Sequence, residues 1–223
     1  MNNNLNTARA SNIKADSPEV KQVVDFAEGL IYTKFLCISR PNHVVLTKRR
    51  EQTTLRTVRI PNELDNALET ISKEKGLSVN SFVSMLLRKY VEWDKYADRF
   101  GYITLTRESL RRILHATDDS KLIESAQDYG STVPKEFLMF WFKELNIDSV
   151  LNALSLRCKY ANVAEYELKT DGRNYMIILH HDLGLKWSEF FGYTLQQEIK
   201  TILQVLARLE ISRNSIVLRF QLP

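Results

Sequence analysis

Cysteine is scarce in this chain, and its two cysteines, Cys37 and Cys158, are far apart and belong to no Cys-x-x-Cys pair. The sequence therefore indicates neither a disulfide framework nor a structural zinc site, and we expect reduced thiols. No apolar run approaches the roughly 18 to 20 residues of a membrane span. The Asn-rich start, MNNNLNTARASN, lacks the apolar core of a signal peptide, so we expect a cytoplasmic protein.

Motifs of the common enzyme classes are also missing. No Gly-rich phosphate loop occurs, and the segment KWSE at 186–189 has no neighbouring base placed for nucleophilic catalysis. We therefore expect neither an enzymatic activity nor a cofactor.

The chain does have enough apolar sequence for a folded core. Of its 223 residues, 44% are hydrophobic and 26% are charged, which favours two small globular domains. The net charge of +4 comes from residues 1–50, which contain eight Lys or Arg against four Asp or Glu. The basic run Lys48-Arg49-Arg50 thus gathers positive charge where a polyanion would be met.

Residues 1–50 are expected to form an N-terminal extension. Residues 1–16 have no apolar period and are predicted to be disordered. Ser17 as N-cap and Pro18 in the first turn predict an amphipathic helix over 17–35. A short strand at 44–46 and a basic linker are expected to follow.

Residues 51–101 give the clearest pattern. Residues 55–60 alternate as in a strand, Pro61 is placed to begin a helix, and Ser78 is placed to cap a second one. The apolar stripe of the second helix continues at spacings of three and four, so this helix is predicted to run unbroken to Gly101. A helix of that length would join two domains stiffly.

Residues 102–223 predict an α+β domain for sensing, assembly or partner binding. Four helices are expected first, in TRESLRRILHA, SKLIESAQDYG, PKEFLMFWFKEL and DSVLNALSLRCKYA. Two strands then flank the hairpin turn Asp171-Gly172, a helix covers LKWSEFFGYTLQQEIKTILQVLARL, and NSIVLRFQLP is a final strand. The order ββαβ after a helical layer is typical of a compact α+β fold.

The two faces of the strand predicted at 55–60 differ. Val58 and Ile60 point one way, whereas Leu55, Thr57 and Arg59 point the other. A lone strand before two helices can neither pair its edges nor bury its apolar face, so we expect a homodimer or a higher even-numbered oligomer. A paired two-stranded ribbon fits the major groove of double-stranded DNA, where Arg can contact guanine.

The segment LRTVRIPNELDNALETISKEKGLSVNSFVSMLLRKYVEW resembles the ribbon-helix-helix transcriptional regulators of the Arc, MetJ and CopG type. The resemblance covers about 39 of the 223 residues, and GLSVNS between the two helices is its most specific piece. It implies a prokaryotic-type, intertwined homodimer that regulates transcription by placing paired strands in the major groove.

The resemblance also assigns roles residue by residue. The base-reading positions match Arg59, Thr57 and Leu55; because Leu55 stands where a polar residue is commoner, either a thymine methyl or nothing is its expected contact. The phosphate clamp, formed by backbone amides at the start of the second helix, matches Ser78, Val79 and Asn80. Free N–H groups and the helix dipole favour an anion there.

Further residues complete the expected interface. The long side chain of Arg56 could reach a phosphate from the end of the ribbon, and Lys48, Arg49 and Arg50 are expected to contact phosphates as well. The dimer core is expected to contain Val58, Ile60, Leu64, Leu68, Val83 and Leu86.

His180-His181-Asp182 leaves two interpretations open. It could supply metal ligands at a strand end, as nickel-sensing members of the family place ligands in an appended domain. Adjacent strand residues point to opposite faces, however, and only His43 and His115 remain to complete a shell, so a turn or helix cap is favoured and no metal is expected. The aromatic segments FLMFWFKEL and KWSEFFGY could line a pocket, although core packing is favoured for them.

A second class of function stays open. An antitoxin-like interaction protein would bind a partner protein through its C-terminal domain and use DNA binding only for autoregulation. Antitoxin tails are usually short and flexible, whereas about 120 residues here carry apolar periodicity. The operator sequence and any effector are not encoded in a recognisable motif.

Overall fold

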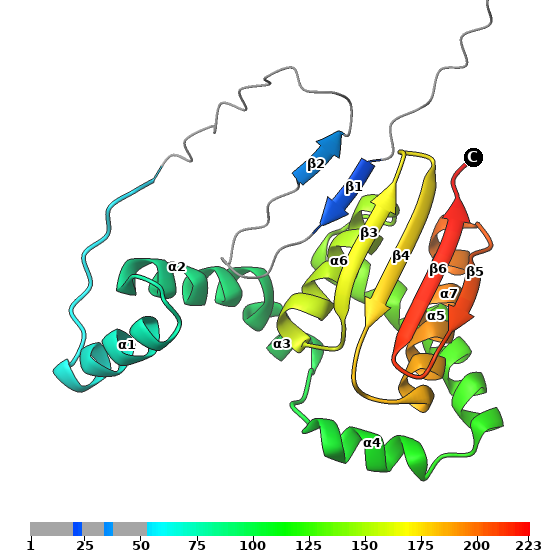
Figure 1. The fold of residues 1–223 in the computed structure, drawn as a ribbon, viewed down its shortest axis with the longest axis horizontal. Coiled ribbons are helices and arrows are strands. Elements are labelled where there is room, and N and C mark those ends of the chain that lie inside the picture. Colours follow the sequence, from blue (N-terminus) through cyan, green and yellow to red (C-terminus); the bar gives the residue numbers. More distant parts are fainter. Residues whose placement is uncertain (1–19, 24–33, 38–52) are drawn as a thin grey trace, which may run out of the picture.

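The computed structural model of this chain describes residues 20–23, 34–37 and 53–223, and Figure 1 shows their arrangement. The fold is mixed α+β, as predicted, with helices packed on an antiparallel sheet. The strand predicted at 44–46, the start that was predicted to be disordered and the basic run 48–50 lie outside the described residues.

The sheet has the strand order β2-β1-β3-β4-β6-β5, and every neighbouring pair is antiparallel. Its strands are β1 (Val20–Val23), β2 (Lys34–Cys37), β3 (Glu165–Thr170), β4 (Asn174–His180), β5 (Arg208–Ile211) and β6 (Ser215–Gln221). β3 and β4 form the hairpin predicted at Asp171-Gly172: Asp171 Oδ1 accepts a hydrogen bond from the Asn174 amide at 2.7 Å, and Gly172 has a φ of 92°.

Three long helices build the core of the C-terminal domain with the sheet. Helices α6 (Ile147–Ala161) and α7 (Leu185–Leu203) pack on one sheet face, and α5 (Asp119–Trp141) packs along α7 (Figure 1). Because side chains alternate along a strand, every second residue of β4 and β6 points to these helices. Among these inward side chains, Ile177, Leu179, Ile216 and Leu218 are fully buried.

The predicted helical connection between the two halves of the chain is confirmed. Helix α1 (Asn62–Glu74) is followed by α2 (Val79–Lys89), which continues through the π-helical segment η1 (Tyr90–Asp94) into α3 (Lys95–Phe100). Gly101 ends this run with a φ of 87°, a conformation that glycine adopts without strain. Helix α4 (Arg107–His115) follows where it was predicted, capped by the Thr106 hydroxyl, which accepts a bond from the Ser109 amide at 3.1 Å.

Two predicted helices near the middle of the chain prove to be one. Pro134 was expected to begin a new helix, but it lies inside α5. Proline removes one helical hydrogen bond. Helix α5 nevertheless continues because its two halves are buried in the same domain, as the full burial of Ala126 and Leu138 on either side of the proline shows.

Two further predictions of helix are wrong because the residues pair into the sheet instead. The helix expected over 17–35 is replaced, in its described residues, by β1 and part of β2, and β1 pairs with β3. Helix α7 ends at Leu203 because Gln204 adopts a left-handed conformation, with a φ of 58°. The chain then forms β5, so the domain has the order ββαββ and not ββαβ.

Candidate nucleic-acid interface

Residues 53–60 lead away from α1 as an open, extended trace (Figure 1), are all exposed, and form no strand within the described chain. The strand that the alternation predicted is therefore not formed by one copy, because no other described segment pairs with it. Its apolar side chains are in solvent: Leu55 is 92% exposed and Val58 is 75% exposed. Arg56, Thr57 and Arg59 are exposed as well.

The helices that follow expose an apolar face of their own. Phe82 is buried between them, but Leu64 and Leu86 remain exposed, and Leu68 and Val83 are half-buried. The four helix residues expected in the core of a dimer therefore lie on one helix pair, and no other described part of the same chain covers them fully. We call residues 53–89 the N-terminal unit.

The start of α2 has the geometry expected of an anion site. Ser78 is the N-cap, and its Oγ accepts a hydrogen bond from the Ser81 amide at 3.1 Å. The amides of Val79 and Asn80 occupy the first helical turn, where an α-helix offers no acceptor. They point out of the helix end together with the positive end of the helix dipole.

Glu92 and Trp93 attach this unit to the C-terminal domain. Trp93 is 5% exposed and packs against Trp141 of α5, with ring centroids 5.2 Å apart. Tyr160 of α6 donates a hydrogen bond to Glu92 Oε2 at 2.7 Å. Burial acts to raise the pKa of Glu92, but the hydrogen bond from Tyr160 and the charge of Lys159 together hold it below its usual value.

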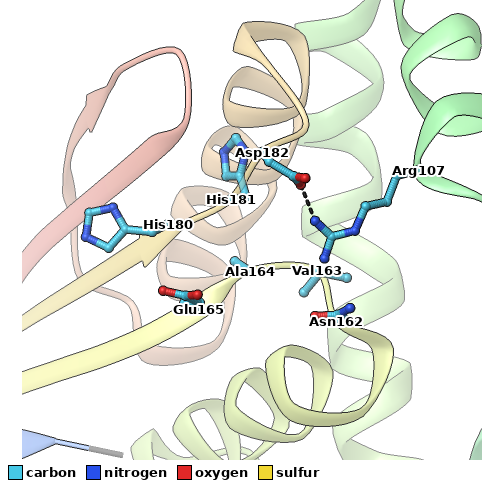
Figure 2. A pocket seen from close by; sticks show the side chains of 8 residues that line it. All are labelled: Arg107, Asn162, Val163, Ala164, Glu165, His180, His181 and Asp182. Atoms are coloured by element: carbon cyan, nitrogen blue, oxygen red, sulfur yellow. Dashed lines mark hydrogen bonds and ion pairs between the residues drawn. The ribbon is translucent and has the colours of Figure 1, made fainter. Parts of the chain in front are cut away.

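A cavity of about 350 Å³ lies at the end of the C-terminal sheet, where β4 leads into α7 (Figure 2). Arg107 of α4 reaches into it and pairs with Asp182, as the dashed line shows. Arg111 adds a hydrogen bond to the Asp182 carbonyl oxygen at 2.8 Å. These contacts fasten α4 to the β4–α7 turn.

His181 stabilises the same β4–α7 turn through hydrogen bonds of its ring. Its Nδ1 accepts a hydrogen bond from the Leu183 amide at 3.2 Å, so the ring proton lies on Nε2, which donates to Ser188 Oγ at 2.8 Å. Both ring nitrogens are therefore engaged, while His180 is exposed. Within the described residues, no group of three or more His, Cys, Asp or Glu is placed to hold a metal ion.

Acidification is expected to weaken this turn. Burial, followed by the neighbouring His180, lowers the pKa of His181, and Asp182 opposes them. The unfolded chain then takes up its proton at a higher pH than the folded chain, so the stabilisation by the neutral ring is present above about pH 6.5 and is lost as the pH falls below that value. Urea unfolding between pH 5 and 8 measures the slope.

The His181→Gln variant should lose part of that slope, because glutamine does not titrate. His115→Gln, which changes an exposed histidine, is the matched control and should keep the wild-type slope. Equal slopes in wild type and His181→Gln would show that His181 does not carry the effect.

Comparison of the chain with protein-family models, with curated proteins and with solved structures finds no match. Among the helices of the described residues, none has the length and apolar character needed to cross a membrane.

Proposed function

We propose that this protein is a homodimeric, sequence-specific DNA-binding transcriptional regulator whose N-terminal unit is a ribbon-helix-helix. The observation that carries the proposal is the extended segment 53–60, which has exposed alternating side chains and no pairing partner in its own described chain. Pairing with the same segment of a second copy would satisfy both backbones and cover Val58.

The apolar face of α1 and α2 supports the same arrangement. A helix pair with so few buried side chains is too small to be stable by itself. A second copy would cover Leu64 and Leu86, which solvent now reaches. Burial of apolar area contributes about 25 cal/mol per Å², so this face favours association.

The paired segments would present Arg59 and Thr57 to the major groove from two symmetric positions. An arginine can form two hydrogen bonds to guanine, and a threonine can contact several bases. The amides of Val79 and Asn80 would receive phosphates, and Lys48, Arg49 and Arg50 would add charge without reading sequence. The C-terminal domain would serve sensing or assembly.

The C-terminal domain bears on the antitoxin-like alternative. A flexible tail that folds on a toxin would have no core of its own, whereas Leu179 and Leu218 are fully buried within this domain. This core therefore favours a regulator with a folded second domain over a flexible tail.

The Arg59→Ala variant tests the proposal. Each arginine-guanine contact discriminates by about 1 to 3 kcal/mol. Arg59→Ala should therefore relax the preference at one symmetric pair of operator positions, with a smaller loss nearby for Thr57→Ala. A selected operator and its single-position variants are titrated with each protein.

Arg88→Ala is the matched control, because Arg88 lies on α2 and pairs with Glu92 at 3.4 Å. It should leave the ranking of operator variants unchanged. Circular dichroism should be the same for all variants, since Arg59 is exposed. If Arg59→Ala ranks the operator variants as wild type does, segment 53–60 does not read the sequence.

A further inference from the structure

The last strand of the sheet, β5, has an open side. It pairs only with β6 in the sheet of the described residues, and it stands at the end of the strand order (Figure 1). A strand in this position exposes backbone donors and acceptors that can pair with another strand. Leu206, just before β5, is 80% exposed.

The hairpin shows which backbone groups point to the open side. The Ser212 amide donates to the Ser215 carbonyl at 2.9 Å, so this pair is hydrogen-bonded to β6. Hydrogen-bonded and non-hydrogen-bonded pairs alternate along an antiparallel ladder. Glu210 and Arg208 therefore bond to β6, whereas the amides and carbonyls of Leu209 and Ile211 face outward.

The side chains of β5 also divide by face. Leu209 and Ile211 point toward α7: a Cβ added to Gly192 would lie 3.2 Å from Leu209 Cδ1 and 3.4 Å from Ile211 Cδ1. Arg208 and Glu210 point to the opposite face, where Glu210 accepts a hydrogen bond from Arg219 at 2.8 Å.

Only one two-fold register suits these side chains. With the axis at Leu209, the outward backbone groups of Leu209 bond to those of the partner's Leu209, and Arg208 lies opposite the partner's Glu210. An axis at Glu210 would place two carboxylates opposite each other, which is unfavourable. An axis at Ile211 would place Glu210 opposite a serine of the partner, so no opposite charges would pair across the axis, and Glu210 would keep only its partners within the chain, Arg208 and Arg219.

We propose that β5 pairs with β5 of a second copy of this chain and extends the sheet across a two-fold axis at Leu209. Short, charged edge strands usually oppose such pairing. Here the two charges of β5 have opposite signs and are two residues apart, so in this register they attract across the axis. The interface joins two sheets into one.

This interface is separate from the N-terminal unit. Helices α1 and α2 lie on one side of the molecule and β5 lies on the opposite side (Figure 1). The two surfaces would therefore engage different copies, and together they would assemble proposed DNA-binding dimers into a larger, even-numbered oligomer.

A charge exchange on the full chain tests the interface. Arg208→Glu places a second carboxylate opposite the partner's Glu210 in both symmetric pairs. In each of the two symmetric pairs, an attraction between opposite charges becomes a repulsion between like charges. The association should therefore weaken at least about tenfold. In Arg208→Glu/Glu210→Arg the signs are exchanged and attraction returns. Analytical ultracentrifugation over a range of micromolar concentrations gives the association constants.

The expected result is weaker association for Arg208→Glu and wild-type association for the double variant. Lys135→Glu makes the same change of charge on the exposed surface of α5 and should associate as wild type does. Circular dichroism verifies folding. Equal association of wild type and Arg208→Glu, or failure of the double variant to recover it, would overturn the proposal.

The outcome is independent of the proposed function. If the N-terminal unit does not dimerise, the masses of all variants are smaller, but the difference between wild type and Arg208→Glu persists. If the β5 interface is wrong, that difference disappears while DNA binding through Arg59 is unaffected.

Discussion

Glu198→Gln is expected to lower the free energy of unfolding of the C-terminal domain by about 3 to 5 kcal/mol, because removing one partner of a buried ion pair leaves the other charge uncompensated. Glu198 lies on α7 and is 0% exposed. Arg157 of α6 donates from Nη2 to both of its carboxylate oxygens, each at 3.0 Å.

The surroundings of this ion pair explain the size of the effect. The guanidinium of Arg157 lies over the ring of Phe137, 5.9 Å from its centroid, and water has little access to it. Burial disfavours the charged guanidinium and acts to lower the pKa of Arg157, but the charge and the hydrogen bonds of Glu198, together with smaller contributions from Tyr102 and Tyr129, raise it above its usual value. Without that carboxylate, nothing comparable stabilises the charge.

Two variants make this measurement specific. Glu189→Gln changes a half-buried glutamate on the same helix and should cost less than about 1 kcal/mol. Replacing both partners, as Arg157→Met/Glu198→Leu, should recover most of the loss, because apolar side chains of similar size do not need compensation. Urea unfolding followed by circular dichroism gives the three values. A loss in Glu198→Gln no larger than in Glu189→Gln would contradict the prediction.

Ile60→Lys is expected to abolish the proposed dimerisation of the N-terminal unit and to reduce operator binding more than about 100-fold. In the proposed dimer Ile60 is part of the shared core, where an unpaired lysine is costly. One chain alone leaves Ile60 39% exposed, so a monomeric unit would tolerate the lysine. DNA titration and thermal unfolding distinguish the two cases.

Ile103→Lys is the matched control for that experiment. Ile103 is a 78% exposed isoleucine between α3 and α4, outside the N-terminal unit. It should bind DNA and unfold as wild type does. An Ile60→Lys protein that binds the operator with wild-type affinity would show that residue 60 is not in a shared core.

The parts of the fold that the sequence predicted correctly are those with local causes. Ser78 caps α2 with its own side chain, and Asp171 closes its hairpin through bonds to residues two and three positions later. Both signals can be recognised in a few residues. The long helical run to Gly101 was predictable because its apolar spacing is continuous.

The parts that sequence reasoning missed depend on strand pairing and side-chain contacts that residue spacing does not encode, several of them between distant residues. The helical pattern of α7 extends past its end, and only pairing with β6 makes Arg208–Ile211 a strand. The Glu92–Tyr160 bond and the Arg157–Glu198 ion pair join residues 68 and 41 positions apart. No spacing rule relates such residues, although a charged residue within the apolar face of α7, as at Glu198, is a signal that could have been used.

The π-helical segment η1 gives the linking helix an angular offset. A π-helical turn holds about one residue more than an α-helical turn, and one residue of an α-helix corresponds to about 100° of rotation. The apolar side chains before and after η1 can therefore face different sides of the helix. Leu86, before it, is exposed, whereas Trp93, within it, is buried against the C-terminal domain. A shift of η1 between π- and α-helical bonding would turn the N-terminal unit about the helix axis without disturbing the core of the C-terminal domain.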